Sequence, residues 1–497
     1  MLALCLAWLA ATVWMRPLML PDEGRYAAVA WEMLRSGDWL TPTLDGLPFF
    51  HKPPLFYWIT GAALALAGPV ELAARAASIV GAVLAAWPLY LFTRRWCDAA
   101  LARRVLLLLL VQPLFFVGAQ FANLDMLVAG CITATVLALA HAALCFEQGL
   151  AHRRTLMLAY GLAALGVLAK GLIGFVLPAM IVGLWLVLRG RWRTLLALLS
   201  LPGLALFLAV AGPWFWAMQQ RFGDFLHYFF VVQHFQRFAA SGFNNTQPFW
   251  FYPVVLALCS LPALLWLRGA LARGYLTAPG VQGSVRLLMV LALGSVLLFF
   301  SLPQSKLIGY ILPAVPALAW LMADASLQAG ETAARRRRWW LTLACGAVLG
   351  LAPVIGLSVD QRHSTRDLAL VLRAQHHSGE PVFMLGGYWY DVPFYARLRE
   401  PVLVVDDWND AAIAQHDNWR KEVADAGAFD PPLARHLLLP PQAWHQALCR
   451  AGGAWVIGTE QSAAQLGLPA QARAIYAARG VTLWHVPGGK GHQAPCS

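Results

Sequence analysis

Three carboxylates stand at unusual positions in this apolar chain. Asp22 and Glu23 follow the first apolar run, in PDEGRYAAVAWEML (residues 21–34), and Asp125 opens another apolar run in FANLDML. A carboxylate at the end of a membrane span is costly unless it is paired, hydrated or functional. Such groups orient an acceptor, remove its proton or stabilise positive charge on a sugar. We therefore predict Asp22, Glu23 and Asp125 as catalytic residues.

Cationic and phenolic side chains form a second group, for which we predict binding of a phosphate and its lipid. Lys52 lies in FFHKPPLFYW (residues 49–58), where two prolines predict an extended backbone and aromatic residues indicate a membrane interface. Lys306 and Tyr310 stand about one helical turn apart in SLPQSKLIGYILP. The full group is Tyr26, Lys52, Lys170, Arg237, Lys306 and Tyr310.

Each candidate also has a structural interpretation. Asp22 and Glu23 would suit a helix N-terminus, and the apolar spacing after them predicts an amphipathic helix that ends near Gly37. Lys52 would suit a solvated loop, and Asp125 would suit an ion pair with an arginine. The functional interpretation is favoured because all these groups fall on one side of the predicted membrane domain.

Two histidines suggest a metal site, although two ligands in separate loops are a weak pattern. His51 precedes Lys52, and His234 lies in VVQHFQRF, where it shares a face with Arg237 if the segment is helical. We predict His51 and His234 as candidate ligands of a divalent metal such as zinc.

The elements that position these residues are membrane helices. The chain has 497 residues, of which 59% are apolar and 12% charged, whereas a soluble domain carries roughly 25% charged residues. Apolar runs near the length of a bilayer span recur along the chain, so we predict an all-α polytopic membrane domain. The eleven predicted spans are 3–19, 70–93, 101–118, 123–146, 155–169, 171–189, 195–216, 250–267, 284–302, 307–323 and 338–357.

The basic residues predict the orientation. With the N-terminus in the cytoplasm, 16 of the 25 Lys and Arg residues before position 358 fall in loops of one side. The positive-inside rule makes that side cytoplasmic. The candidate site then lies on the periplasmic side of a bacterial inner membrane, in the loops 20–69 and 217–249. Arg16 and Arg75 are expected to reach lipid headgroups there.

The tail, residues 358–497, predicts a small soluble α/β domain after a membrane domain of residues 1–357. PVFMLGG, PVLVVDDW, AWVIGT and VTLWHVP indicate strands with helices between them. Eleven spans place this domain in the periplasm, where a disulfide between Cys449 and Cys496 would be stable. Its 12 basic and 13 acidic residues leave the basic excess in the membrane part. Since loops explain that excess and no nucleotide motif is present, we expect no nucleic-acid partner.

The first loop, PDEGRYAAVAWEMLRSGDWLTPTLDGLPFFHKPPLFYW, resembles that of the bacterial aminoarabinose transferases that modify lipid A. NLDM, AKGLIGFVLP, QHFQRF and SKLIGYILPAVPALAWL match the same family in the same order, over roughly residues 1–357. The family is related to the protein O-mannosyltransferases and is similar in architecture to GT-C glycosyltransferases. One departure is that His51 stands where typical members have a glutamate before the lysine.

The resemblance implies a function and its site. Members take a sugar from undecaprenyl phosphate and pass it to an acceptor, commonly a lipid A phosphate. Asp22 and Asp125 would be the essential acids, Lys52, Arg237 and Tyr310 would hold the carrier phosphate, and the positions of His51 and His234 would form the metal site. We therefore expect a membrane-embedded glycosyltransferase that moves 4-amino-4-deoxy-L-arabinose to lipid A.

Three alternatives remain open at this point. The enzyme would transfer a different polyprenyl-phosphate-linked sugar, use another envelope glycan or a protein as acceptor, or the chain would be a flippase for a lipid-linked sugar. A transporter would place its charged residues near the bilayer midplane, often in repeated halves. The predicted site lies at one face and the sequence has no internal repeat, which favours transfer over transport.

Overall fold

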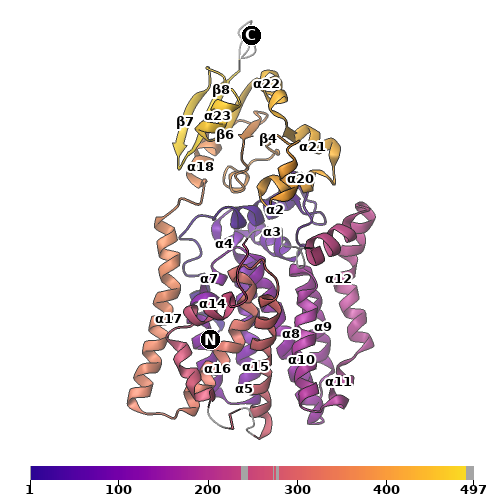
Figure 1. Ribbon diagram of the computed structural model, residues 1–497, viewed down its shortest axis with the longest axis vertical. Helices are drawn as coiled ribbons and strands as arrows, with labels where there is room; N and C mark the ends of the chain where they lie inside the picture. Colours follow the sequence, from indigo (N-terminus) through magenta and orange to yellow (C-terminus); the bar gives the residue numbers. More distant parts are fainter. Residues whose placement is uncertain (1, 237–244, 272–273, 276–278, 489–497) are drawn as a thin grey trace.

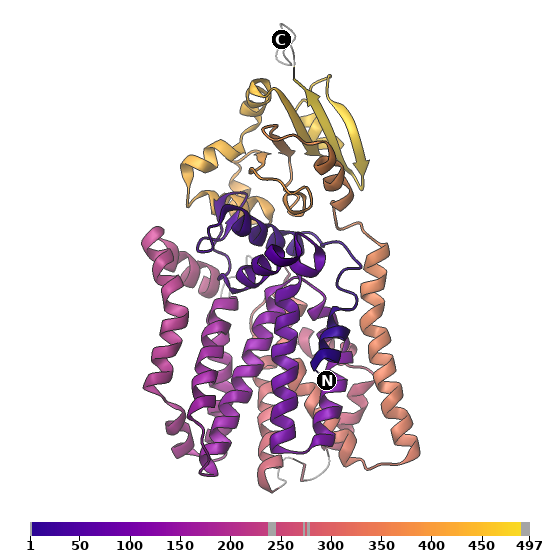
Figure 2. The ribbon, with the colours of Figure 1, turned by 180° about the vertical axis from the view of Figure 1, so that it is seen from behind.

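The computed structural model describes residues 2–236, 245–271, 274–275 and 279–488. A long helical bundle carries a C-terminal α/β domain on one end, here called the domain-facing end (Figure 1). Short helices lie between the two parts, as the view from behind also shows (Figure 2). They are α2 (Asp22–Ser36), α3 (Leu55–Ala67) and α4 (Glu71–Ala74).

The bundle is built from apolar helices. In chain order it contains α1 (Leu2–Ala10), α5 (Ala76–Trp96), α6 (Ala99–Val111), α7 (Pro113–Ala119), α8 (Leu124–Glu147), α9 (Arg153–Lys170), α10 (Ile173–Leu188), α11 (Trp192–Leu198), α12 (Leu201–Arg221), η1 (His227–Gln236), α14 (Phe251–Cys259), η2 (Ala263–Leu271), α15 (Gly280–Ser301), η3 (Ile308–Ala314), α16 (Val315–Gln328) and α17 (Ala333–Val359). Within the described residues, six of these helices, η3 and α16 counted as one, are long and apolar enough to cross a membrane. Two bent pairs, α6 with α7 and α14 with η2, raise the number to eight. The chain is therefore a multi-pass membrane protein.

The eleven predicted spans all fall on helices, but those at 3–19, 155–169 and 171–189 fall on helices that are too short or too charged to count among the six to eight above. The first predicted span, 3–19, contains only the nine-residue helix α1. Helices α9 and α10 occupy the fifth and sixth spans and meet at the turn after Lys170. Hydropathy misses a break of this kind because the residues on both sides of it are apolar. The bend between α6 and α7, where Gln112 caps α7, is an example.

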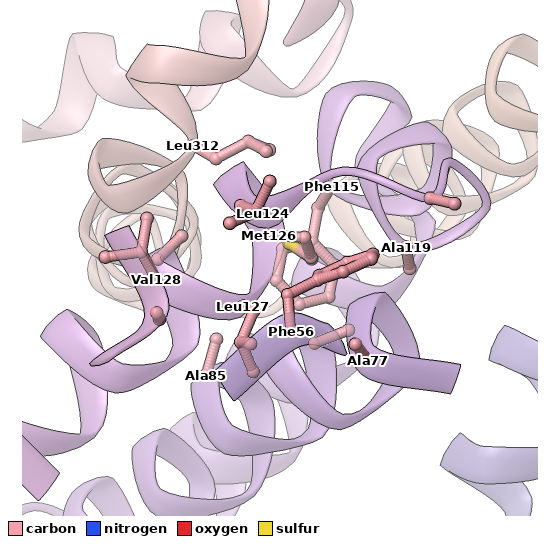
Figure 3. Close-up of a cluster of buried hydrophobic side chains, with 14 of the residues drawn as sticks. Phe56, Ala77, Ala85, Phe115, Ala119, Leu124, Met126, Leu127, Val128 and Leu312 are labelled. Carbon is pink, nitrogen blue, oxygen red and sulfur yellow. The ribbon is translucent and has the colours of Figure 1, made fainter. Parts of the chain in front are cut away.

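Close backbone contact positions α8 in the centre of the bundle. A Cβ at Gly130 of α8 would lie 2.1 Å from the carbonyl oxygen of Gly81 in α5, so only glycine permits this crossing. At the domain-facing end, Leu124 and Leu127 of α8 pack among Phe56 of α3 and other buried side chains (Figure 3). This packing fixes α3, and through it α2, over the end of α8.

The predicted amphipathic helix is confirmed as α2. It ends where Gly37 adopts φ 73°, a left-handed conformation that glycine allows at low cost. Glu32 then fixes the following hairpin, β1 (Thr43–Leu44) and β2 (Leu47–Pro48), by accepting hydrogen bonds from Thr43 Oγ1 at 2.8 Å and from the backbone N–H of Asp45 at 2.7 Å. The expected extended backbone after Lys52 is wrong at Pro54, which has helical φ and ψ and caps α3.

The C-terminal domain holds a mixed six-stranded sheet. Its elements are α18 (Arg366–Gln375), β3 (Val382–Leu385), α19 (Val392–Tyr395), β4 (Leu403–Val405), η4 (Ala411–Gln415), α20 (Trp419–Gly427), α21 (Pro431–Leu437), β5 (Leu438–Leu439), α22 (Pro441–Arg450), β6 (Gly453–Gly458), α23 (Glu460–Gln465), β7 (Arg473–Ala478) and β8 (Val481–Pro487). The strand order is β5-β4-β3-β6-β8-β7, parallel through β6 and antiparallel beyond it. All four predicted strands are confirmed as β3, β4, β6 and β8, whereas β5 and β7 were not expected.

The C-terminal domain is attached to the bundle by specific polar contacts. Tyr395 Oη accepts a hydrogen bond from the backbone N–H of Leu18 at 2.8 Å and donates to Glu71 at 3.1 Å. The backbone N–H of Val402 donates to Asp45 at 2.8 Å. Cys449 is disulfide-bonded, and Cys496 lies outside the described residues, so the proposed pairing of the two stays a prediction.

Candidate active site

A cavity of about 60 Å³ lies where α2, the bundle and the C-terminal domain meet. Seven of the predicted site residues line it: Asp22, Tyr26, His51, Lys52, Asp125, Lys170 and Tyr310. The other lining residues are Arg25, Phe49, Asn123, Leu124, Leu307 and Glu422. Among these described residues, three carboxylates face three cations. Arg25, Lys52 and Lys170 are side chains of the kind that bind phosphate groups.

Asp22 is the more open acid of the first loop. It accepts a hydrogen bond from Arg25, one turn later on α2, and its side chain remains 35% exposed. Burial raises the pKa of the Asp22 carboxyl, and Asp125 and Glu422 add to the rise, whereas Arg25 opposes it. Asp22 therefore faces the cavity beside one cation, and its carboxyl takes up a proton more readily than that of an ordinary aspartate.

Asp125 is placed by the start of α8. The side chain of Asn123 caps this helix by accepting the backbone N–H of Asp125 at 3.0 Å. Lys170, at the end of α9, forms an ion pair with Asp125, and its Nζ lies 4.1 Å from the ring centroid of Tyr310. Helices α8, α9 and η3, which are distant in sequence, therefore meet at the Asp125 carboxylate.

Glu23 does not line the cavity, which corrects its predicted catalytic role. Its carboxylate is fully buried and accepts hydrogen bonds from Arg16 and Arg75, the latter at 2.8 Å from Nε. Burial alone would raise the pKa of Glu23, but the two guanidinium groups hold it at about 2. The expected headgroup contacts of Arg16 and Arg75 are also wrong, since both side chains are buried against Glu23.

Lys306 is also placed outside the cavity. Its Nζ donates to the backbone oxygens of Gln247, at 2.9 Å, and Pro303, so it joins two loops and is not positioned to hold a phosphate. Arg237 lies outside the described residues, as does the side chain of His234. Among the residues that the structure describes, no group of three or more His, Cys, Asp or Glu side chains could hold a metal ion. The predicted zinc site at His51 and His234 therefore stays a prediction, because the side chain of His234 is not among those described.

Comparisons with known proteins show the family and the fold. Residues 51–216 match the family model for Dolichyl-phosphate-mannose-protein mannosyltransferase. The chain is 34% identical over 375 residues to the undecaprenyl phosphate-alpha-4-amino-4-deoxy-L-arabinose arabinosyl transferase of Aeromonas salmonicida, a match that covers 72% of this chain and 67% of that protein. The chain belongs to this arabinosyl transferase family.

Two further matches agree with the membership. Arabinosyl transferase 1 of Sodalis glossinidius is 40% identical over 314 residues, which is 62% of this chain but only 55% of that protein. The crystal structure of ArnT from Cupriavidus metallidurans bound to undecaprenyl phosphate matches with a TM-score of 0.80 and 22% identity, covering 98% of each chain. The whole chain, including its C-terminal domain, therefore has the fold of that arabinosyl transferase.

Two charged residues of this arabinosyl transferase family member were missed at the site. Arg25 lies in DEGRYA, three residues after Asp22. This spacing on a helix predicts a cation beside the acid and could have identified Arg25. Glu422 lies in α20, about 400 residues from Asp22. Nothing in its local sequence distinguishes it from an ordinary surface acid, because only domain docking brings it to the cavity.

Gly309 is expected to be essential to the position of Asp125. A Cβ at Gly309 would lie 2.2 Å from Asp125 Oδ2, so the Asp125 carboxylate must move in the Gly309→Ala variant. We predict a loss of sugar transfer of about tenfold or more, because small misplacement of a reacting group is costly. Initial rates would be compared with those of Gly294→Ala, whose added methyl meets nothing within 4 Å. Equal rates for both variants would contradict the assigned position of Asp125.

Proposed function

We propose that this chain transfers 4-amino-4-deoxy-L-arabinose from undecaprenyl phosphate to a phosphate group of lipid A. The observation that supports the proposal best is the pairing of carboxylates with cations in the cavity, at the domain-facing end of an arabinosyl transferase fold. The relatives are named as undecaprenyl phosphate-aminoarabinose arabinosyl transferases. The site residues have the chemistry that this reaction needs.

The donor phosphate is the leaving group. Lys52 and Lys170 line the cavity. In this proposal they stabilise the negative charge of undecaprenyl phosphate as the bond between the sugar C1 and the phosphate oxygen breaks. The electron pair of that bond stays on the phosphate oxygen. An oxygen of the acceptor forms the new bond to C1 from the opposite face, so the configuration at C1 is inverted. Tyr310 holds Lys170 in place through its ring.

Asp22 acts on the sugar. A phosphate monoester has a second pKa of about 6 and is already charged at neutral pH, so this acceptor does not require a general base. The carboxylate of Asp22 instead stabilises the positive charge that develops at C1 in the transition state. Asp125, paired with Lys170, lies on the bundle side of the same cavity and orients the reacting groups.

The orientation in the membrane follows the arginines. The basic residues at the start of α17 and in the turns opposite the domain-facing end favour the cytoplasm. The site and the C-terminal domain, residues 358–497, then lie in the periplasm, beyond the membrane helices of residues 1–357. Lipid A of the outer leaflet and the lipid-linked donor would both reach this face.

Mass spectrometry of lipid A tests the proposal. Cells that express the chain are expected to show lipid A with an added mass of one 4-amino-4-deoxy-L-arabinosyl group on a phosphate, absent from cells without it. A different added mass would show that the transferred sugar is not 4-amino-4-deoxy-L-arabinose. Lipid A that is unchanged under expression would reject lipid A as the acceptor and direct the search to other envelope glycans and to proteins.

A further inference from the structure

The C-terminal domain contributes a charged residue to the cavity. Glu422 of α20 projects onto α2 and accepts a hydrogen bond from Arg25, while its second oxygen accepts one from Tyr390 Oη at 2.5 Å. Arg25 donates at the same time to Asp22. One guanidinium is thus shared between a carboxylate of the membrane domain and a carboxylate of the C-terminal domain.

The two carboxylates differ in access. Glu422 is 11% exposed and Arg25 is 13% exposed, whereas Asp22 is 35% exposed. Arg25 also lies over two rings, 5.1 Å from the centroid of Tyr26 and 5.9 Å from that of Tyr390. The guanidinium therefore has a fixed position, and Asp22 is the member of the group that is free to meet a substrate.

This sharing controls how much of the charge of Asp22 acts on a substrate. If Arg25 had only Asp22 as its partner, the cation would neutralise the carboxylate and weaken its effect on positive charge at the sugar. A second acid on Arg25 divides the attraction of the cation between two carboxylates. The raised pKa of Asp22, to which Glu422 contributes, is in agreement with this arrangement.

We propose that Glu422 is a positioning residue that, through Arg25, keeps the charge of Asp22 available to the sugar. This inference rests on the proposed function and assigns to the C-terminal domain a direct part in it. The other charged groups near Asp22 are Glu23 on α2, Asp125 on α8, and Lys52 and Lys170 in the cavity wall. A substitution at position 422 leaves all of them in place.

Glu422→Gln tests the proposal, because the amide retains the shape of the side chain but not its charge. We expect the turnover number of the purified protein, assayed with undecaprenyl phosphate-linked aminoarabinose and lipid A, to fall by about tenfold, with the KM for the donor changed less than about twofold. The acidic limb of the pH profile should move to lower pH, since Arg25 then pairs with Asp22 alone. Glu422→Asp should restore part of the rate.

A second measurement does not depend on the substrate. The carboxyl of Asp22 can be titrated by infrared difference spectroscopy, with Asp22→Asn as the blank. We expect it to titrate at lower pH in Glu422→Gln than in the wild type. Glu460→Gln, an exposed acid-to-amide change in α23, is the matched control and should change neither measurement.

The outcomes separate the two proposals. A wild-type protein without transfer rejects the proposed function, while the infrared titration still decides the role of Glu422. An active wild type with an unchanged rate and titration in Glu422→Gln overturns only the role of Glu422. A loss of rate with an unchanged titration, or with a lowered melting temperature, also overturns it, because it would indicate a purely structural contact.

Discussion

Asp22→Asn is expected to reduce sugar transfer at least about 100-fold while the protein still folds, because removal of one preorganised group that stabilises transition-state charge commonly costs about two to three orders of magnitude. Asparagine keeps the size of the side chain and an oxygen for Arg25. It removes the negative charge that opposes the charge developing on the sugar. The measurement is the initial rate of the purified protein in lipid vesicles with the lipid-linked donor and lipid A.

The pH dependence gives the same prediction a second readout. The pKa of Asp22 is raised by burial above that of an ordinary aspartate. The wild-type rate should therefore fall, as the pH is lowered, at a higher pH than an ordinary aspartate would give, because protonation removes the charge. The residual rate of Asp22→Asn should lack this acidic limb.

Asp38→Asn is the matched control for Asp22→Asn. Asp38 lies in the same loop and pairs with Arg221 at 2.9 Å, but it does not line the cavity. Its amide variant should transfer sugar within about twofold of the wild type, since a partly exposed ion pair contributes little. A normal rate in Asp22→Asn, or an equal loss in both variants, would remove Asp22 from the proposed mechanism.

Glu23→Ala is expected to destabilise the protein by about 3–5 kcal/mol, because it leaves a buried charge without its partner. The carboxylate of Glu23 is shared by Arg16 and Arg75 and also accepts the backbone N–H of Ala122 at 2.7 Å. Its removal therefore affects α2, the segment before α5 and the segment before α8 together. The measurement is thermal unfolding in detergent, with the yield of folded protein as a second readout.

The stability of the wild type should follow the same ion pairs. The pKa of Glu23 is lowered from 4.5 to about 2, so the folded state binds fewer protons than the unfolded state in this range. The stabilisation is fully present above pH 4.5 and is lost as the pH falls toward 2. Asp360→Asn, in an exposed pair with Arg362, is the control and should unfold like the wild type. An unchanged melting temperature in Glu23→Ala would contradict the structural assignment of this residue.

The sequence by itself determined the class of the protein and much of the cavity. Long apolar runs predicted a membrane bundle, and short apolar runs in the tail predicted four of the six strands in the large sheet. Seven residues chosen for their chemistry do line one cavity. They could be found because an acid, a lysine or a phenol beside an apolar run stands out against its local composition.

The tertiary structure decided which of two adjacent carboxylates faces the cavity. Successive side chains of a helix point about 100° apart, so Asp22 and Glu23 cannot share one environment. Which of them turns inward depends on Arg16, Arg75 and the segment before α8, which come together only in the folded bundle. Glu422 joins the site through domain docking alone, because it is separated from Asp22 by almost the whole chain. Local sequence patterns predict helices and strands, whereas the packing of those elements determines which charged residues distant along the chain become partners.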